Sequence, residues 1–170
     1  MEMTMSPRHY LYLICGGLAI IFVAGNSLKP TGTAIPLNED EVHCLAQTIY
    51  HESRGESLAG QLAVGMVVVN RTKSDVWPKT ICETVKQGPI SSNGIPIKNR
   101  CQFSWYCANS KMSIKEEELW QRSLSVSRSI IGGEVFDFTD GATFFHSNKV
   151  NPKWNYKKVA QIDNHIFYRK

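Results

Sequence analysis

The segment from Asn38 to Gly55 has the pattern of an amphipathic helix whose buried face ends in a carboxylate. Asn38 can accept hydrogen bonds from the free backbone donors of the first turn, and Glu41 stands where a capping box needs it. Apolar residues then recur on one helix face at Val42, Leu45 and Ile49. The same spacing brings Glu52 onto that face, and Gly55 offers a left-handed helix end. The sequence therefore predicts a helix over about 39–52.

A carboxylate on a core-facing stripe is poorly hydrated, and burial disfavours its charged form. We therefore expect the pKa of Glu52 to rise from about 4.3 toward the roughly 6–7 that suits a general acid at neutral pH. The alternative is that the Glu52 side chain frays into solvent, or pairs with Arg54 or a lysine. The helix pattern alone leaves both interpretations open.

A second helix is expected directly after this segment. Ser57 can cap a helix over about 58–72, and residues 62–69 are apolar on nearly all sides. A buried strand is the alternative for this run because it contains three consecutive valines. The length of the segment and the lack of early turn signals favour a buried central helix.

The remaining segments are shorter or less regular. A short helix is predicted over 80–87, and a longer one over 113–131, opened by a capping box of Ser113 and Glu116. Residues 101–107 alternate between polar and aromatic residues, which is typical of a short extended segment between two cysteines.

The last 35 residues change character. Aromatic and β-branched residues at 142–146 and 159–168 predict strands, and Asp140-Gly141 and Asp163-Asn164 predict turns. Together with the helices, these strands predict an α+β domain that is mainly α, with a small β region.

The first 28 residues differ from the rest. An uncharged run from Tyr10 to Leu28 follows Arg8, and its most apolar part, 10–25, is short for a spanning helix and near the length of a signal peptide's apolar region. We predict an export signal or a weak signal anchor over 1–28, with a buried N-terminal helix as the alternative. A linker over 29–37 and a single folded domain over 38–170 follow. The protein should be exported to the periplasm or cell envelope, and residues 10–28 could hold it at the membrane.

The cysteines and the net charge support an extracytoplasmic protein. Four of the five cysteines follow the leader, at Cys44, Cys82, Cys101 and Cys107. An even number in an oxidising compartment predicts two disulfides, with three pairings open, while Cys-x5-Cys is not a usual zinc spacing. The net charge of +4 suits an anionic polymer such as a cell wall, and the chain has no Lys/Arg block that would indicate nucleic acid.

Several motifs appear in a characteristic order. They are His51-Glu52-Ser53-Arg54-Gly55-Glu56, Val69-Asn70-Arg71, Trp77-Pro78, Cys101-Gln102-Phe103-Ser104-Trp105, Phe145-His146, Asn151-Pro152 and His165-Ile166-Phe167-Tyr168. With these motifs the chain resembles the SleB/CwlJ-type cell-wall hydrolases over about residues 40–168. The resemblance implies a lysozyme-like α+β domain that cleaves peptidoglycan between N-acetylmuramic acid and N-acetylglucosamine, usually as a lytic transglycosylase. The resemblance also implies that the family's catalytic glutamate corresponds to Glu52. The chain departs from the family at Phe144, near which we expect a His or Tyr.

The predicted site therefore consists of Glu52 as general acid and base, together with residues that can contact sugars. These substrate-binding candidates are Tyr50, Glu56, Gln102, Phe103, Ser104, Trp105, His146 and Trp154. Ordinary hydrolysis uses a second carboxylate about 5–9.5 Å away, for which Glu56 is the nearby candidate. A structural role for Glu56, capping the second helix or pairing with an arginine, is the alternative. A lytic transglycosylase needs only one glutamate, because the C6 hydroxyl of muramic acid is the nucleophile.

Two other functions stay open from the sequence. One is a zinc-dependent wall amidase that uses histidines such as His43, His51, His146 or His165, although Gly55 stands where a metalloprotease helix would carry its second histidine. The other is a non-catalytic wall-binding module. For the favoured glycosidase we expect a monomer that binds peptidoglycan glycan strands and needs no metal or cofactor.

Overall fold

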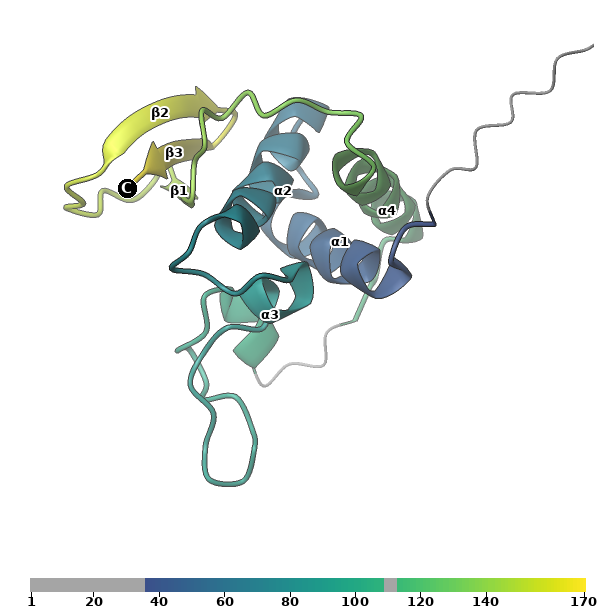
Figure 1. Ribbon diagram of the computed structural model, residues 1–170, viewed down its shortest axis with the longest axis vertical. Helices are drawn as coiled ribbons and strands as arrows, with labels where there is room; N and C mark the ends of the chain where they lie inside the picture. The colour runs from purple at the N-terminus through teal and green to yellow at the C-terminus, as the bar shows by residue number, and fades with distance from the viewer. Residues whose placement is uncertain (1–35, 109–112) are drawn as a thin grey trace, which may run out of the picture. The chain divides into compact units, whose positions relative to one another are not determined.

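The computed structural model describes residues 36–108 and 113–170, and Figure 1 shows how the elements are arranged. Within these ranges the helices are α1 (Glu39–Ser53), α2 (Leu58–Lys73), α3 (Ile81–Val85), the 3-10 helix η1 (Ser104–Cys107) and α4 (Glu117–Ile131). The strands are β1 (Phe144–Ser147), β2 (Lys157–Ile162) and β3 (His165–Arg169). The predicted leader lies outside the described residues. No helix in the described part is long and apolar enough to span a bilayer.

Helix α2 lies between the other helices and the sheet (Figure 1). Its Val64 and Val67 are fully buried and pack in one cluster with Phe167 of β3. Its opposite side packs against α1 and α4, and a Cβ on Gly65 would lie only 2.5 Å from the Ile130 side chain, so the helices approach closely there. The prediction of a buried central helix is confirmed, and the strand alternative is wrong.

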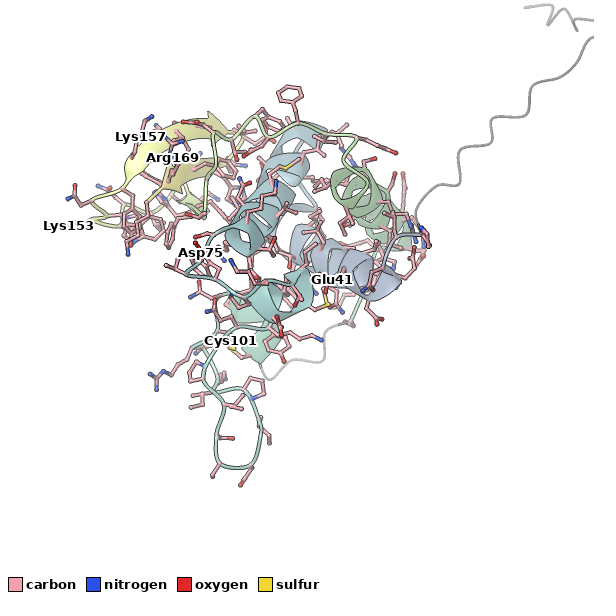
Figure 2. The ribbon with its side chains drawn as sticks, viewed as in Figure 1. Glu41, Asp75, Cys101, Lys153, Lys157 and Arg169 are labelled. Carbon is pink, nitrogen blue, oxygen red and sulfur yellow. A yellow bond between two sulfur atoms is a disulfide. The ribbon has the colours of Figure 1, made fainter. Side chains whose placement is uncertain are left out.

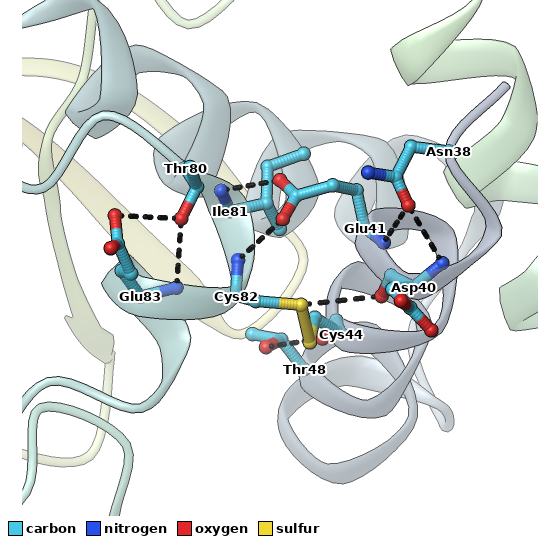
Figure 3. The surroundings of a disulfide bond; sticks show 9 residues. All are labelled: Asn38, Asp40, Glu41, Cys44, Thr48, Thr80, Ile81, Cys82 and Glu83. Carbon is cyan, nitrogen blue, oxygen red and sulfur yellow. Dashed lines mark hydrogen bonds between the residues drawn. A yellow bond between two sulfur atoms is a disulfide. The ribbon is translucent and has the colours of Figure 1, made fainter.

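The capping box at the start of α1 forms only in part. Asn38 caps the helix as predicted, because its side chain accepts from the backbone N–H groups of the first turn. The Glu41 carboxylate does not return to Asn38. It instead accepts from Ile81 N (2.6 Å) and Cys82 N (3.3 Å), the first backbone donors of α3 (Figure 3). Glu41 therefore holds α3 against α1.

The two predicted disulfides are present. Cys44–Cys82 joins α1 to α3 beside the Glu41 contact (Figure 3), and Cys101–Cys107 closes a short loop. The extended segment predicted over 101–107 is wrong, because its end forms η1 instead. The Cα atoms of Cys101 and Cys107 are 6.0 Å apart, whereas an extended segment of that length would span roughly 20 Å. The bridge therefore requires a turn.

The three strands form an antiparallel sheet in the order β1-β3-β2. The predicted turn at Asp163-Asn164 divides the expected strand 159–168 into β2 and β3, and Asp163 has a positive φ of 47°. Asp140 bonds to Arg169 of β3 (3.0 Å) and lies 3.7 Å from Lys157 of β2, and Figure 2 shows these two basic side chains on the sheet. A mainly α fold with a small β region is confirmed.

The start of α4 differs from the prediction. The helix begins at Glu117 rather than near Ser113, and its N-cap Glu116 makes no side-chain capping bond. The Glu116 carboxylate instead accepts a hydrogen bond from the Tyr50 hydroxyl and pairs with Arg54 (3.3 Å). The predicted capping box is therefore wrong, because a partner on α1 takes the carboxylate that it needs.

Candidate active site

Glu52 lies in the last turn of α1 and is partly buried. Burial raises the pKa of its carboxyl above the ordinary value, and the nearby Arg71 charge opposes that rise. Arg54 is not its partner, because the Arg54 guanidinium pairs with Glu116 and lies over the Tyr50 ring, 5.0 Å from its centroid. The helix-face prediction for Glu52 is confirmed, and the alternative of an Arg54 ion pair is wrong.

The end of α1 is closed differently from the prediction. The last turn passes into Arg54, which keeps a right-handed backbone (φ −57°, ψ −27°). The Glu56 backbone N–H then donates to the Ser53 carbonyl (2.9 Å). Gly55 has no positive φ, so the predicted left-handed stop is wrong. Glu52 is consequently held in regular helical geometry.

Arg71, in the last turn of α2, is a further candidate site residue, which the sequence placed in a motif but not in the predicted site. It is only 5% exposed, and its Nε donates to the Thr143 carbonyl (2.8 Å). Its guanidinium lies 4.3 Å from the centroid of the Trp77 ring and near the rings of Phe103 and Phe144 (5.4 and 5.8 Å). Its Nη1 is buried and has no hydrogen-bond partner. The available signal was the Val69-Asn70-Arg71 motif, which follows the apolar run of α2.

Glu52 and Arg71 act on each other electrostatically. Burial lowers the pKa of Arg71 to about 10, and the Glu52 charge opposes that change, so the guanidinium stays charged at neutral pH. No ion pair joins the two groups in the described part of the chain. The site therefore holds an acid of raised pKa and an incompletely bonded cation, contributed by the ends of two neighbouring helices.

An aromatic cluster adjoins Arg71. The ring of Phe144 on β1 contacts Tyr156 (4.7 Å between centroids), Trp154 (5.8 Å) and Trp77 (5.8 Å). Trp154 is 38% exposed, so part of this cluster faces solvent. Phe144 thus lies between Trp154, a predicted site residue, and the Arg71 guanidinium. The resemblance predicts a polar residue near this position. Exposed aromatic faces of this kind can pack against sugar rings.

His146 lies at the edge of the same cluster with both ring nitrogens in use. Its Nδ1 donates to the Ser147 carbonyl (2.9 Å), which fixes the tautomer, and its Nε2 accepts from the Tyr168 hydroxyl (3.0 Å). The ring stacks on Tyr168 and meets Trp154 edge-on. The structure thus favours a structural role for His146, and its sugar contact stays a prediction.

The predicted site residues of segment 101–105 face in two directions, toward the protein interior and toward solvent. Phe103 is buried and approaches Arg71, whereas Gln102 and Ser104 are exposed. Trp105 stacks on His51 with ring centroids 4.8 Å apart. Phe103 and Trp105 are therefore placed beside the helix ends that carry Arg71 and Glu52, and Gln102 and Ser104 present their side chains to solvent.

Two of the predicted substrate-binding residues, Tyr50 and Glu56, are hydrogen-bonded to other parts of the protein. Tyr50 is 2% exposed, and its hydroxyl binds Glu116, so its ring has no free face for a sugar. The Glu56 carboxylate accepts from Asn164 N (3.3 Å) and Asn164 Nδ2 (3.1 Å) at the β2–β3 turn. Ser57 rather than Glu56 caps α2, and no arginine in the described ranges pairs with Glu56. Its structural role is to hold the sheet to the α1–α2 connection.

Comparison with known proteins identifies relatives over most of the chain. Residues 55–168 match the Cell Wall Hydrolase family. The spore cortex-lytic enzyme of Oceanobacillus iheyensis is 34% identical over 155 residues, which cover 85% of this chain and 49% of that protein. The spore cortex-lytic enzyme of Halalkalibacterium halodurans is 23% identical over 145 residues, covering 84% and 38%. The chain thus spans less than half the length of these relatives.

Two solved structures share the fold. The catalytic domain of the germination-specific lytic transglycosylase SleB from Bacillus anthracis aligns with a TM-score of 0.57 at 21% identity, covering 79% of this chain and all of that domain. The catalytic domain of Bacillus cereus SleB aligns with a TM-score of 0.54 at 21% identity, covering 83% and 100%. The predicted lysozyme-like fold is confirmed by these alignments. The match over residues 55–168 shows that the chain belongs to the cell wall hydrolase family.

Proposed function

We propose that the protein is a peptidoglycan-cleaving glycosidase that cuts the bond between N-acetylmuramic acid and N-acetylglucosamine as a lytic transglycosylase. The observation that carries this proposal is Glu52, a carboxyl of raised pKa at the end of α1. A raised pKa extends the pH range over which the carboxyl keeps its proton, as a general acid requires. The spore cortex-lytic relatives and the lytic transglycosylase domain of the same fold support the substrate class.

The proposed reaction needs one glutamate and no water. Glu52 protonates the glycosidic oxygen, the bond from that oxygen to the muramic C1 breaks, and positive charge develops on the sugar. The Glu52 carboxylate then removes the proton of the muramic C6 hydroxyl while that oxygen bonds to C1. The products are a free N-acetylglucosamine hydroxyl and a 1,6-anhydromuramoyl end, and Glu52 is protonated again.

The position of Glu56 supports this reaction over ordinary hydrolysis. Hydrolysis by a pair of carboxylates requires the second one to face the scissile bond, as nucleophile or as base for water. The Glu56 carboxylate is instead hydrogen-bonded to Asn164 at the β2–β3 turn. A transglycosylase does not need it, because the substrate supplies the nucleophile.

The proposal is tested with the full chain on purified peptidoglycan, in the presence and absence of a chelator. Glu52→Gln should lower the rate of turbidity loss by roughly 10²–10⁴-fold, because positioned acids typically contribute that much. Glu56→Gln is the matched control and should lose activity only in proportion to lost stability. Mass spectrometry of the wild-type products should find 1,6-anhydro ends.

Other outcomes would select another function. Retention of more than about a tenth of the activity by Glu52→Gln would remove the general-acid role. Reducing muramic ends, together with an inactive but folded Glu56→Gln protein, would identify a lysozyme-type hydrolase. Loss of activity in chelator that zinc restores would favour the amidase, although residues 36–108 and 113–170 bring no three potential metal ligands together. Binding without cleavage would indicate a wall-binding module.

The site of action follows from the proposed substrate. An enzyme that acts on peptidoglycan works in the cell envelope, which agrees with the export signal or anchor that the sequence predicts over residues 1–28. Cell fractionation of the full chain, followed by N-terminal sequencing, distinguishes a cleaved signal from a retained membrane anchor.

A further inference from the structure

We infer that Arg71 is a substrate-binding residue, whose guanidinium donates a hydrogen bond to an acyl oxygen of the amino sugar bound at Glu52. This inference rests on the proposed function and adds a named contact to it. The acyl oxygen can belong to the 2-N-acetyl group or to the 3-O-lactyl group of muramic acid. Both are carbonyl or carboxylate oxygens, the acceptors that a guanidinium binds best.

The first observation is the unsatisfied Nη1. Arg71 is 95% buried, since its exposed fraction is 5%, and its Nη1 has no acceptor in the described structure. A buried donor without an acceptor costs free energy that is larger for a charged group. Native proteins keep few such groups. A ligand oxygen that reaches the guanidinium would supply the missing acceptor.

The second observation is that the other contacts of Arg71 fix the guanidinium in place. Its Nε donates to the Thr143 carbonyl, and its Cζ lies 4.3 Å from the centroid of the Trp77 ring. These contacts explain why the side chain is held at the end of α2, but neither one uses Nη1. A structural role alone would be complete without this nitrogen.

The third observation concerns the neighbours of Arg71, which are the acid Glu52 and the aromatic cluster around Phe144. Arg71 approaches the ring of Phe103, and Trp105, two residues further on, stacks on His51, the neighbour of Glu52. No ion pair joins Glu52 and Arg71 among the described residues. The aromatic cluster around Phe144 begins at Trp77 and continues to the exposed Trp154. A sugar that packs on this cluster has its acyl groups near the guanidinium and its glycosidic bond near the acid.

The test measures binding without turnover in the full chain carrying Glu52→Gln. The probes are chitotetraose, which carries only N-acetyl groups, and a peptide-free glycan of alternating N-acetylglucosamine and N-acetylmuramic acid. Calorimetry gives Kd for this protein and for versions that also carry Arg71→Lys or Arg71→Met. Arg128→Met is the control, because Arg128 is half-exposed and pairs with Glu39 on another surface. Thermal unfolding checks that each variant is folded.

We expect both Arg71 variants to raise Kd by roughly 10-fold or more, and the Arg128 variant to leave it unchanged. Lysine keeps the charge but lacks the planar guanidinium, which has one nitrogen for Thr143 and others for the sugar. An equal loss for both glycans assigns the N-acetyl oxygen, and a loss confined to the muramic glycan assigns the lactyl oxygen. An unchanged Kd for both glycans in a folded Arg71 variant overturns the inference.

Two further outcomes are decisive. If neither Arg71 variant folds, the Glu52→Gln protein is compared with chitotetraose and cellotetraose, which has hydroxyls in place of acyl groups. Weaker binding of cellotetraose supports the inference, and equal binding overturns it. If the wild type cleaves no wall material and Glu52→Gln binds neither glycan, the proposed function and this inference both fail. If the wild type cleaves wall material but the Arg71 variants bind both glycans with unchanged Kd, this inference fails and the proposed function stands.

Discussion

The two disulfides should contribute unequally to stability, because they close loops of different length. Cys44 and Cys82 are 38 residues apart, and Cys101 and Cys107 are 6 apart. The chain-entropy relation gives about 3.9 kcal/mol for the longer loop and about 2.2 kcal/mol for the shorter one. The paired variant Cys44→Ala/Cys82→Ala should therefore lose about 1.7 kcal/mol more than Cys101→Ala/Cys107→Ala.

Denaturant unfolding of the unreduced variants measures both values by linear extrapolation. Replacing Cys82 removes the bridge but leaves the neighbouring hydrogen bonds, because Glu41 accepts from backbone N–H groups of α3. The measured loss therefore reports on the bridge itself. In reductant, the wild type should lose about 6 kcal/mol, comparable with the whole stability of many domains. Reduction should therefore bring the domain close to unfolding.

Two results would refute this reasoning. If removing Cys101–Cys107 cost as much stability as removing Cys44–Cys82, loop length would not govern the contribution of the bridges. Thiol titration of the unfolded, unreduced chain gives the second check. The chain has five cysteines, four of which are paired in the described structure, so only Cys15 should react. Four or five reactive thiols would show that the bridges do not form.

The other predictions concern the two glutamates. Glu56→Gln should cost about 1 kcal/mol of unfolding free energy, because it weakens the acceptor for Asn164, and Asn164→Ala should cost a similar amount. A double variant that loses the sum of both would show that this contact is not the cause. Glu52→Gln should stabilise the protein at pH 7–8 but not near pH 4. Burial raises the folded-state pKa of Glu52, so the wild type loses stability as pH rises from the unfolded-state value through the folded one, and glutamine does not. Unfolding curves across this pH range measure the difference, and a constant difference would contradict the pKa direction.

The sequence determined the features that depend on neighbouring residues. The caps at Asn38 and Ser57, the buried stripe that ends in Glu52, and the apolar run of α2 all follow from helix periodicity and first-turn donors. The turn at Asp163-Asn164 was likewise read from local composition. The pKa direction of Glu52 followed because a helix face dictates which side chains lose water.

The local rules failed where a distant partner took a side chain. Glu41 and Glu116 both had capping-box spacing, but Glu41 bonds to α3, and Glu116 is held by Tyr50 and Arg54. The segment 101–107 had strand alternation, but its disulfide imposes a turn. In each case a contact formed by the folded chain has a larger effect than the preference of the local sequence.

Only the tertiary structure decided which side chains surround Glu52. Arg71 bonds to a carbonyl 72 residues away, at Thr143, and its guanidinium meets rings from three separate segments. Glu56, four residues after Glu52 in the motif, bonds to a partner 108 residues away, Asn164. Spacing along a helix fixes which face a residue occupies. Which distant groups meet that face depends on the path of the whole chain, and no local pattern encodes it.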